Sequence, residues 1–543
     1  MTANATSIDL SGLVEIEATE VCPPPRWALL ESHLIKLMED SVEPMVDRYA
    51  EKGGAFYYAD DVDDLYERTS NWGLFYAMGA SERVLELALQ QWHATSRFFA
   101  DDIVSRVHPR FNPQIHNEYY NLGSPGASEW HHKGEGNMGF YYFGLADPTI
   151  SENLRRAKRF AAMYMDEDPQ ASNYDPEHNI FRCPMQSSIG PLIHASLDHA
   201  NGWLQGEGQN HYYGVRATLY PLVKDLEPDW HENPQRRDEI LKLFDEVVLK
   251  GDIPNSLGAT ALITHAYLHT GDEKYKQWVL KYTEGWIKRM RRNGGIMPDN
   301  VGPTGQIGEQ RQGQWWGGLY GWNSFVCHYI MFSSLTIAAE CALLLTGDFG
   351  YLDLLRSQIK VLMDNAITRE DGQLLLPSRY GPNGWEHVRE NLSRERGRFV
   401  PFRMQELAHL YHASFANEDY ELIDRIRETD KERDWNEVPA LGEKNYGDTE
   451  LARFQYYDGK NPDWPEKILS AEIQNAMADL ETIRNENRDA HTLIAENESP
   501  PNPVYTKGLT QVMMGAPQSV YTGGLLRATV RYFDPDRGRP GLP

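Results

Sequence analysis

The stretch LGATALITHAYLHTGDEKYKQWVLKYTEGW, residues 257–286, decides how the rest of the chain is interpreted. Its first half is rich in small and apolar residues at helical spacing, and its second half is more charged. Thr270, Gly271 and Asp272 stand between the two halves. Glycine readily takes the left-handed conformation that ends a helix, and aspartate caps the start of the next helix. The stretch therefore predicts two helices joined by a tight turn.

The same pattern recurs along the chain, at 71–92, 136–160 and 335–362. The last of these, LTIAAECALLLTGDFGYLDLLRSQIKVL, repeats the Thr-Gly-Asp turn. Repeated helical hairpins form either an open solenoid or a closed ring. A solenoid keeps a tight period, whereas these repeats are separated by long and unequal segments. We therefore expect about six hairpins in a closed double ring, with the small-residue helices inside and the charged helices outside.

The hairpins with TGDEKY-type turns resemble those of the six-hairpin glycosidase-like superfamily, the (α/α)6 toroids. The resemblance covers roughly residues 26–425 and is nearest in character to glucuronyl hydrolases and β-glucuronidases. It implies an all-α fold with long functional loops at one end of the ring. It also implies an activity on carbohydrates, because the superfamily includes inverting glycosidases, sugar epimerases and the helical domains of polysaccharide lyases. No catalytic signature is matched, so no residue role is carried over from it.

This resemblance predicts one catalytic toroid domain over residues 26–530. An N-terminal extension precedes it at 1–25, and a C-terminal tail follows at 531–543. The polar segment 430–466 is expected to be an excursion on the surface. A small β element is expected near the C-terminus.

The overall charge excludes several classes of partner. The chain has 53 basic and 79 acidic residues among 543, which gives a net charge of −26. Such a protein repels nucleic-acid backbones and anionic lipids, so neither is an expected partner. The four cysteines form no CxxC pair, which argues against a disulfide scaffold and a structural zinc site. A secretory signal and a membrane-spanning run are both missing from the sequence pattern, which favours a cytoplasmic protein unless a signal has been removed.

A glycine- and tryptophan-rich stretch at 294–323 is the first candidate for a functional loop. It reads GGIMPDNVGPTGQIGEQRQGQWWGGLYGWN, which no regular helix or strand tolerates. Ordered aromatic loops with a few polar groups are typical of pocket walls. The candidate catalytic carboxylates here are Asp299 and Glu309. The candidate substrate-binding residues are Arg311, which suits a carboxylate, and the aromatics Trp315, Trp316, Tyr320 and Trp322.

A second polar and aromatic loop is predicted at 108–140. Mixed His, Glu and Tyr clusters on loops are where general acids and bases are expected. The candidate catalytic residues here are His116, Glu118, Tyr120 and Glu135. The candidate substrate-binding residues are Asn117, Tyr119, Trp130, His131 and His132, together with His211 and Tyr212 further along the chain. The spacing His131-His132-x-x-Glu135 is not a standard zinc motif, so no metal and no other cofactor is expected.

These residues leave four functions open. The favoured one is a glycoside hydrolase for oligosaccharides, including uronic-acid-containing ones, which needs two carboxyl groups about 5–9.5 Å apart. The first alternative is a lyase that uses His116, Asn117, Tyr119 and Tyr120 for β-elimination at a uronate. The second is a sugar epimerase or isomerase, which the His-rich loops permit. The third is a non-enzymatic helical scaffold, which the aromatic loops disfavour. The oligomeric state, the sugar and the linkage stay undetermined.

Overall fold

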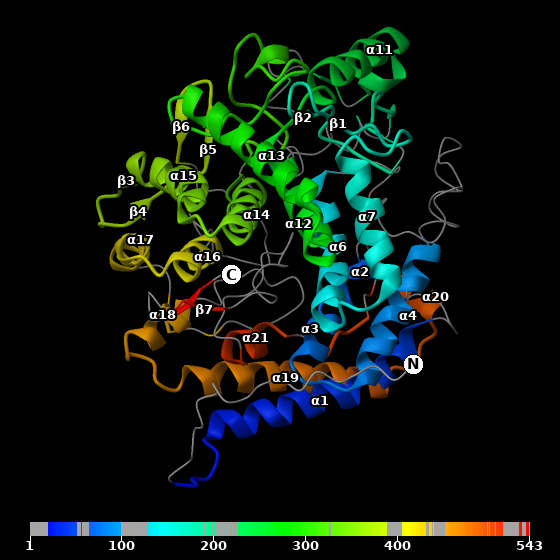
Figure 1. Ribbon diagram of the computed structural model, residues 1–543, viewed down its shortest axis with the longest axis vertical. Coiled ribbons are helices and arrows are strands. Elements are labelled where there is room, and N and C mark those ends of the chain that lie inside the picture. Colours follow the sequence, from blue (N-terminus) through cyan, green and yellow to red (C-terminus); the bar gives the residue numbers. More distant parts are fainter. Residues whose placement is uncertain are drawn as a thin grey trace, which may run out of the picture.

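The structure is a computed structural model of the chain, and helices dominate it (Figure 1). The described residues fall in long ranges, with shorter stretches and single residues between them. The long ranges are 20–50, 64–98, 129–188, 229–324, 327–387, 404–430, 451–496, 500–504 and 506–513. The helices in these ranges are all too short or too polar to cross a membrane.

Within the described ranges, consecutive helices pair into the hairpins that the sequence predicts. The pairs are α3 (Trp72–Ala77) with α4 (Glu82–Phe98), α6 (Trp130–Ala146) with α7 (Ser151–Tyr164), α12 (Ala259–Thr270) with α13 (Glu273–Arg292), α14 (Cys327–Thr346) with α15 (Asp353–Asp364), and α16 (Met404–Ser414) with α17 (Asn417–Thr429).

The Thr-Gly-Asp turns have the predicted geometry in both copies. Gly271 ends α12 with a φ of +64°, and the Asp272 side chain accepts a hydrogen bond from the backbone N–H of Lys274 at 3.1 Å. Gly347 has a φ of +73°, and Asp348 accepts from the backbone N–H of Gly350 at 2.8 Å. The left-handed glycine ends one helix and the aspartate caps the next element, as the sequence indicates.

The first helices of the hairpins form a ring. α3 contacts α6, α6 contacts α12, α12 contacts α14, and α14 contacts α16 (Figure 1). α21 (Lys507–Met513) occupies the sixth inner position, because the Asn71 amide donates to the Val504 carbonyl at 3.1 Å and the Thr510 hydroxyl lies 3.9 Å from the Met78 sulfur. α19 (Trp464–Asn485) packs outside α21 and against α1 (Arg26–Tyr49). The all-α, (α/α)6 toroid prediction is confirmed.

The lengths of the connections distinguish the two ends of the ring. The turns from an inner to an outer helix span 78–81, 147–150, 271–272, 347–352 and 415–416. The segments from an outer helix to the next inner helix are far longer, at 99–129, 165–258, 293–326 and 365–403. All the long segments therefore meet the N-terminal ends of the inner helices, which we call the loop end of the ring. The opposite end is called the turn end.

Burial follows the inner and outer positions. The inner helix α12 is buried continuously from Ala259 to Ala266. The outer helix α13 buries one face, with Tyr275, Trp278, Tyr282 and Trp286 at three- and four-residue spacings. Each such large apolar side chain contributes roughly 1.5–3 kcal/mol when it is removed from water. A second, smaller apolar cluster is formed mainly by residues of the 165–258 segment, together with Leu319, Tyr320 and Ile330.

The remaining elements are short. The helical ones are α2 (Asp64–Glu67), α11 (Pro234–Leu243), α18 (Leu451–Tyr457), α20 (Ala490–Ala495), the 3-10 helices η3 (Trp230–Glu232), η5 (Pro254–Gly258), η6 (Glu309–Arg311) and η7 (Phe349–Leu352), and the π-helix η4 (Phe244–Val248). The strands form antiparallel pairs: β1 (Tyr174–Asp175) with β2 (Ile180–Phe181), β3 (Ile367–Thr368) with β4 (Leu374–Leu375), β5 (Arg379–Gly381) with β6 (Gly384–Glu386), and β7 (Tyr532–Asp534) with β8 (Arg539–Gly541). The last pair is the predicted C-terminal β element.

Two local expectations are corrected. Residues 130–136, expected in a loop, belong to α6, although Gly134 and Gly136 lower the helical propensity there. Packing on α3 and α12 overrides that propensity, because most of the helix is buried. The segment 430–466 contains α18, with Arg453 and Phe454 fully buried, so that part of it is packed into the fold.

Candidate active site

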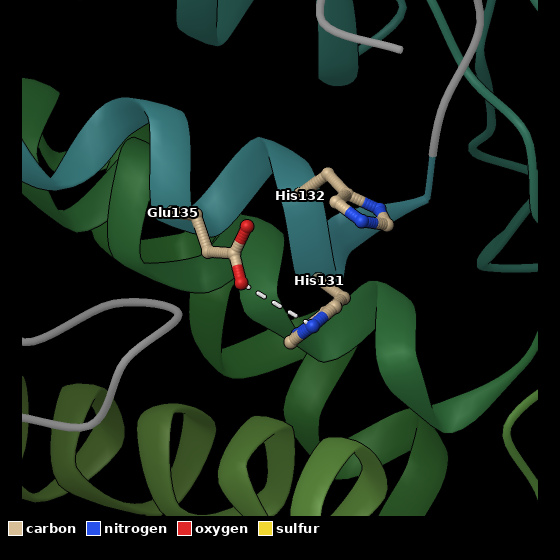
Figure 2. Close-up of side chains that lie close together, drawn as sticks. All are labelled: His131, His132 and Glu135. Carbon is tan, nitrogen blue, oxygen red and sulfur yellow. Dashed lines mark ion pairs between the residues drawn. The ribbon is translucent and has the colours of Figure 1, made fainter. Parts of the chain in front are cut away.

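A buried pair of side chains opens α6 at the loop end. His131 Nε2 lies 3.3 Å from Glu135 Oε1, and both side chains are 4% exposed. They stand four residues apart, so they share one face of the helix, as Figure 2 shows. The Tyr66 hydroxyl, from α2, donates to the other oxygen of Glu135 at 3.3 Å. The carboxylate therefore orients the imidazole, and the tyrosine orients the carboxylate.

Glu129, the residue before α6, forms a second cluster beside this pair. Its Oε1 accepts a hydrogen bond from the Tyr320 hydroxyl at 2.7 Å and also contacts His132 Nδ1. Burial opposes the negative charge, but the attraction of His132 and His131 and the Tyr320 hydrogen bond outweigh it and lower the pKa of Glu129 to about 2. Glu129 is therefore a carboxylate at neutral pH. The rings of His131 and Tyr320 lie 6.2 Å apart, so the two clusters adjoin.

The start of α6 also offers three donor atoms to a cation. Ligand atoms of His131, His132 and Glu135 all lie within 4.8 Å of one another. His132 leaves the helix in a different direction from the other two (Figure 2). His131 Nε2 already pairs with Glu135 and His132 Nδ1 with Glu129, so a cation bound through these two nitrogens would compete with both contacts.

Asp299 and Glu309, the two candidate carboxylates of the 294–323 stretch, are held by that stretch itself. Asp299 is fully buried and accepts backbone N–H groups from Gly317, Gly318 and Trp322 at 2.8–2.9 Å. Burial raises the pKa of Asp299, while these hydrogen bonds oppose the shift. Glu309 accepts the backbone N–H and the hydroxyl of Thr304, both at 2.9 Å. Both carboxylates fix the shape of the loop.

Arg311 anchors the same loop to the π-helix η4. Its Nη2 donates to the Val247 carbonyl at 3.3 Å. Burial lowers the pKa of Arg311 to about 10, and the charge of Asp299 opposes the shift. Its Nη1 is buried and has no hydrogen-bond partner among the described residues.

Half-buried aromatic side chains from two long segments form a wall, which we call the aromatic wall. Its members are Trp315, Trp316, Tyr380 and Trp385. The Tyr380 ring centroid lies 4.7 Å from that of Trp315, 5.8 Å from that of Trp316 and 4.9 Å from that of Trp385. The backbone N–H of Tyr380 donates to the Trp322 carbonyl at 2.7 Å, which ties the β5–β6 hairpin to the 294–323 loop.

Trp322 and Trp130, expected to contact a substrate, pack in the core instead. Trp322 is fully buried, donates from Nε1 to the Met297 carbonyl at 2.7 Å, and supports Trp385 from behind. Trp130 is also fully buried, and its Nε1 donates to Gln186 at 2.8 Å. In each case the indole N–H already has a protein partner. The other expected site residues, His116, Asn117, Glu118, Tyr119, Tyr120, His211 and Tyr212, lie outside the described residues.

The structure adds four residues that the sequence pattern left unnoticed: Tyr66, Glu129, Tyr380 and Trp385. The last two had a usable signal, because RYGPNGWE at 379–386 carries an Asn-Gly pair between aromatic residues, which is typical of a hairpin. Predicting Glu129 as a site residue requires the correct first residue of α6, because Glu129 lies beside His132 only when the helix starts at Trp130.

The fold and the loop-end cluster define the chain as an (α/α)6 toroid with a buried His–Glu pair at its loop end. The chain belongs to the family described as "Domain of unknown function (DUF8034)", which it matches over residues 15–510. Among curated proteins, none matches it.

Several solved structures show distant similarity. One is the cellobiose 2-epimerase from Bacillus thermoamylovorans B4167, with 12% identity, a TM-score of 0.41, and coverage of 74% of this chain and 87% of that one. A D-mannose isomerase has 13% identity and a TM-score of 0.38, and the match covers 83% of this chain and 98% of that one. The cellobiose 2-epimerase from Spirochaeta thermophila DSM 6192 has 16% identity and a TM-score of 0.25, covering 74% and 98%. At these levels no activity is carried over from them.

Proposed function

We propose that this protein is a carbohydrate-active enzyme that moves a proton within a sugar, as isomerases and epimerases do. The observation that carries the proposal is the buried pair His131–Glu135 at the loop end, with its Nε2–Oε1 distance of 3.3 Å. Histidine is the side chain that most often takes and returns protons near neutral pH. A carboxylate on one side of the ring fixes its orientation and stabilises the imidazolium that forms.

In the open-chain form of a reducing sugar, the carbon beside the carbonyl carries an acidic proton. His131 would remove that proton, and the electrons of the broken C–H bond would move onto the carbonyl oxygen to give an enediolate, with the imidazolium held by Glu135. Delivery of a proton from solvent to the opposite face of the same carbon restores the carbonyl and gives an epimer. For an isomer, the proton of the adjacent hydroxyl moves to the former carbonyl oxygen and a proton is delivered to the former carbonyl carbon, so that the carbonyl shifts by one carbon.

Paired-carboxylate hydrolysis has less support from the described residues. It requires one carboxyl group to protonate the leaving group and a second to activate water or to attack. Asp299 and Glu309 are engaged by backbone and hydroxyl donors of their own loop. Glu129 and Glu135 are each paired with a histidine. We therefore place the histidine, and not a carboxylate pair, at the centre of the reaction.

The aromatic wall supports a sugar as the substrate. Indole and phenol rings offer apolar faces that stack on sugar rings and polar edges that meet hydroxyl groups. Trp315 and Trp316 would provide these faces, with Tyr380 supporting them. Arg311 on the same loop is the candidate for attracting a carboxylate on an acidic sugar, because guanidinium groups suit carboxylates.

A product assay on a panel of reducing mono- and disaccharides, including uronates, tests the proposal. Chromatography and mass spectrometry should find a new sugar of unchanged mass. Release of additional reducing ends would instead identify a hydrolase. A product that absorbs as an unsaturated uronate would identify a lyase. Either of those two results would overturn the proposal.

A further inference from the structure

The contact between Tyr320 and Glu129 joins two parts of the chain that are almost two hundred residues apart. We infer that these two residues form a latch that holds the 294–323 loop against the His131–Glu135 pair, with Glu129 acting as a positioning residue. The hydroxyl of Tyr320 donates to Glu129 Oε1 at 2.7 Å. The effect of this latch on catalysis rests on the proposed function, whereas its effect on the loop does not.

The loop holds the backbone of Tyr320 in an unfavourable conformation that persists only when neighbouring contacts stabilise it. Tyr320 has a φ of +54°, in the left-handed region that bulky residues rarely adopt. The residues around it are fixed by Asp299, which accepts the backbone N–H groups of Gly317, Gly318 and Trp322. The buried carboxylate therefore shapes the backbone that points the tyrosine hydroxyl toward α6.

Two glycines allow the loop backbone to pass close to Asp299. A Cβ at Gly318 would lie 2.0 Å from the Asp299 carbonyl oxygen, and one at Gly321 would lie 2.1 Å from Asp299 Oδ2. Any side chain at either position would push the loop away from Asp299. The sequence GGLYG thus brackets the tyrosine with residues that let the loop close around the carboxylate.

At the other end of the contact, Glu129 is 2% exposed and is the residue immediately before α6. The oxygen that accepts from Tyr320 also contacts Nδ1 of His132. The ring of Tyr320 lies 6.2 Å from that of His131. One carboxylate oxygen therefore links the aromatic loop, the second histidine and the helix that carries the proposed catalytic pair.

The latch predicts two linked effects. Breaking it should loosen the loop, because a buried charge-assisted hydrogen bond is lost. The loop also carries Trp315 and Trp316, so a loosened loop should bind sugar less tightly and raise KM more than it lowers kcat. A role in general stability alone would reduce the amount of folded enzyme and leave KM unchanged.

Amide hydrogen exchange of peptides covering 314–323 tests the latch directly, in the full-length protein without added sugar. Tyr320→Phe removes the donor and keeps the ring, so exchange there should be roughly 10- to 100-fold faster. Tyr420→Phe is the matched control, because Tyr420 donates to Asp458 at the same 2.7 Å far from this loop. It should leave 314–323 unchanged. Equal protection in Tyr320→Phe and the wild type would overturn the latch.

A series at Glu129 provides the second measurement. Glu129→Gln keeps an oxygen that can accept from Tyr320, so it should loosen the loop less than Glu129→Ala does. Equal loosening in both, with an unchanged KM, would assign Glu129 a general packing role and overturn the inference. If the exchange results hold but the wild type converts no sugar in the panel, the latch stands and the proposed function fails. If sugars are converted and Tyr320→Phe leaves loop exchange and KM unchanged, the latch fails and the function stands.

Discussion

Two pairs of ring side chains, one at each end of the toroid, use histidine in opposite ways. At the loop end, His131 faces the carboxylate of Glu135 at 3.3 Å. Toward the turn end, His265 and His269 on α12 face each other, with ring centroids 4.6 Å apart. Both pairs stand four residues apart on an inner helix. The first imidazole faces a carboxylate, whereas burial lowers the pKa of both histidines in the second pair.

The surroundings of the second pair explain the difference. His265 is 2% exposed and packs on Phe140 and against Gly144, whose Cβ would lie 2.6 Å from the ring. The Nε2 atoms of both rings are buried without a hydrogen-bond partner among the described residues. Burial and the neighbouring ring lower the pKa of His265 well below its ordinary value. Under the proposed function, the same residue type therefore transfers protons at one end of the ring, and it packs in the core at the other.

The largest expected effect is a loss of kcat on substitution in the His131–Glu135 pair, which substitution in the His265–His269 pair should not cause. His131→Asn should lower kcat on the sugar identified in the panel by roughly 10²- to 10⁴-fold, because a general base is lost. His269→Asn, at the turn end, should leave kcat within a factor of about two. Steady-state kinetics on both purified variants checks this. Comparable losses in the two would remove the functional distinction between the ends.

The second-largest expected effect is on stability, and it shows which carboxylates of the 294–323 loop stabilise the fold. Asp299→Ala should lower the free energy of unfolding by about 3 kcal/mol or more, since several backbone donors lose a buried acceptor. Glu309→Ala, on a partly exposed turn, should cost less than about 1 kcal/mol. Urea denaturation of both variants measures the two values. A small cost at Asp299 would contradict its role in shaping the loop.

A smaller effect concerns pH and the turn end. The folded-state pKa of His265 is depressed, so the unfolded chain binds its proton near pH 6.5 while the folded chain resists it. Its contribution to stability is therefore present above about pH 6.5 and is lost as the pH falls, by up to about 1.4 kcal/mol per pH unit. Unfolding free energies at pH 7.5 and 5.5 should show this decline in the wild type and a flatter dependence in His265→Met. An identical slope in both would show that His265 does not titrate in this way.

The smallest expected effect is that of a chelator. His131 and His132 each contact a carboxylate through one ring nitrogen, so we expect the start of α6 to keep its shape without a cation. Dialysis against EDTA should leave both the melting temperature and the activity unchanged. A loss that added Zn²⁺ restores would instead assign His131, His132 and Glu135 as metal ligands.

The hairpins and the ring could be predicted because local signals agree there. The Thr-Gly-Asp turns and the alternation of small-residue and charged helices specify each hairpin on its own, as Gly271 and Gly347 show. The aromatic loop at 294–323 could be predicted for the same reason, since its glycines and prolines exclude regular structure.

The arrangement of the site could not be predicted, because it depends on contacts between distant segments. Gly134 and Gly136 give the first turns of α6 the composition of a loop. These turns are helical because they pack against α3 and α12. The partners of Glu129 and Glu135 come from Tyr320 and Tyr66, far away in the chain. The structural use of Asp299 likewise becomes visible only when the loop folds around it.

Proton transfer by His131 is the central claim, and solvent isotope exchange tests it most directly. The wild-type enzyme is incubated in D₂O with the sugar it converts, and the product is examined by proton NMR. We expect deuterium at the carbon beside the carbonyl in the wild type, with the rate of incorporation reduced roughly 10²-fold or more in His131→Asn. Conversion without deuterium at that carbon, or incorporation at the wild-type rate in His131→Asn, would contradict it.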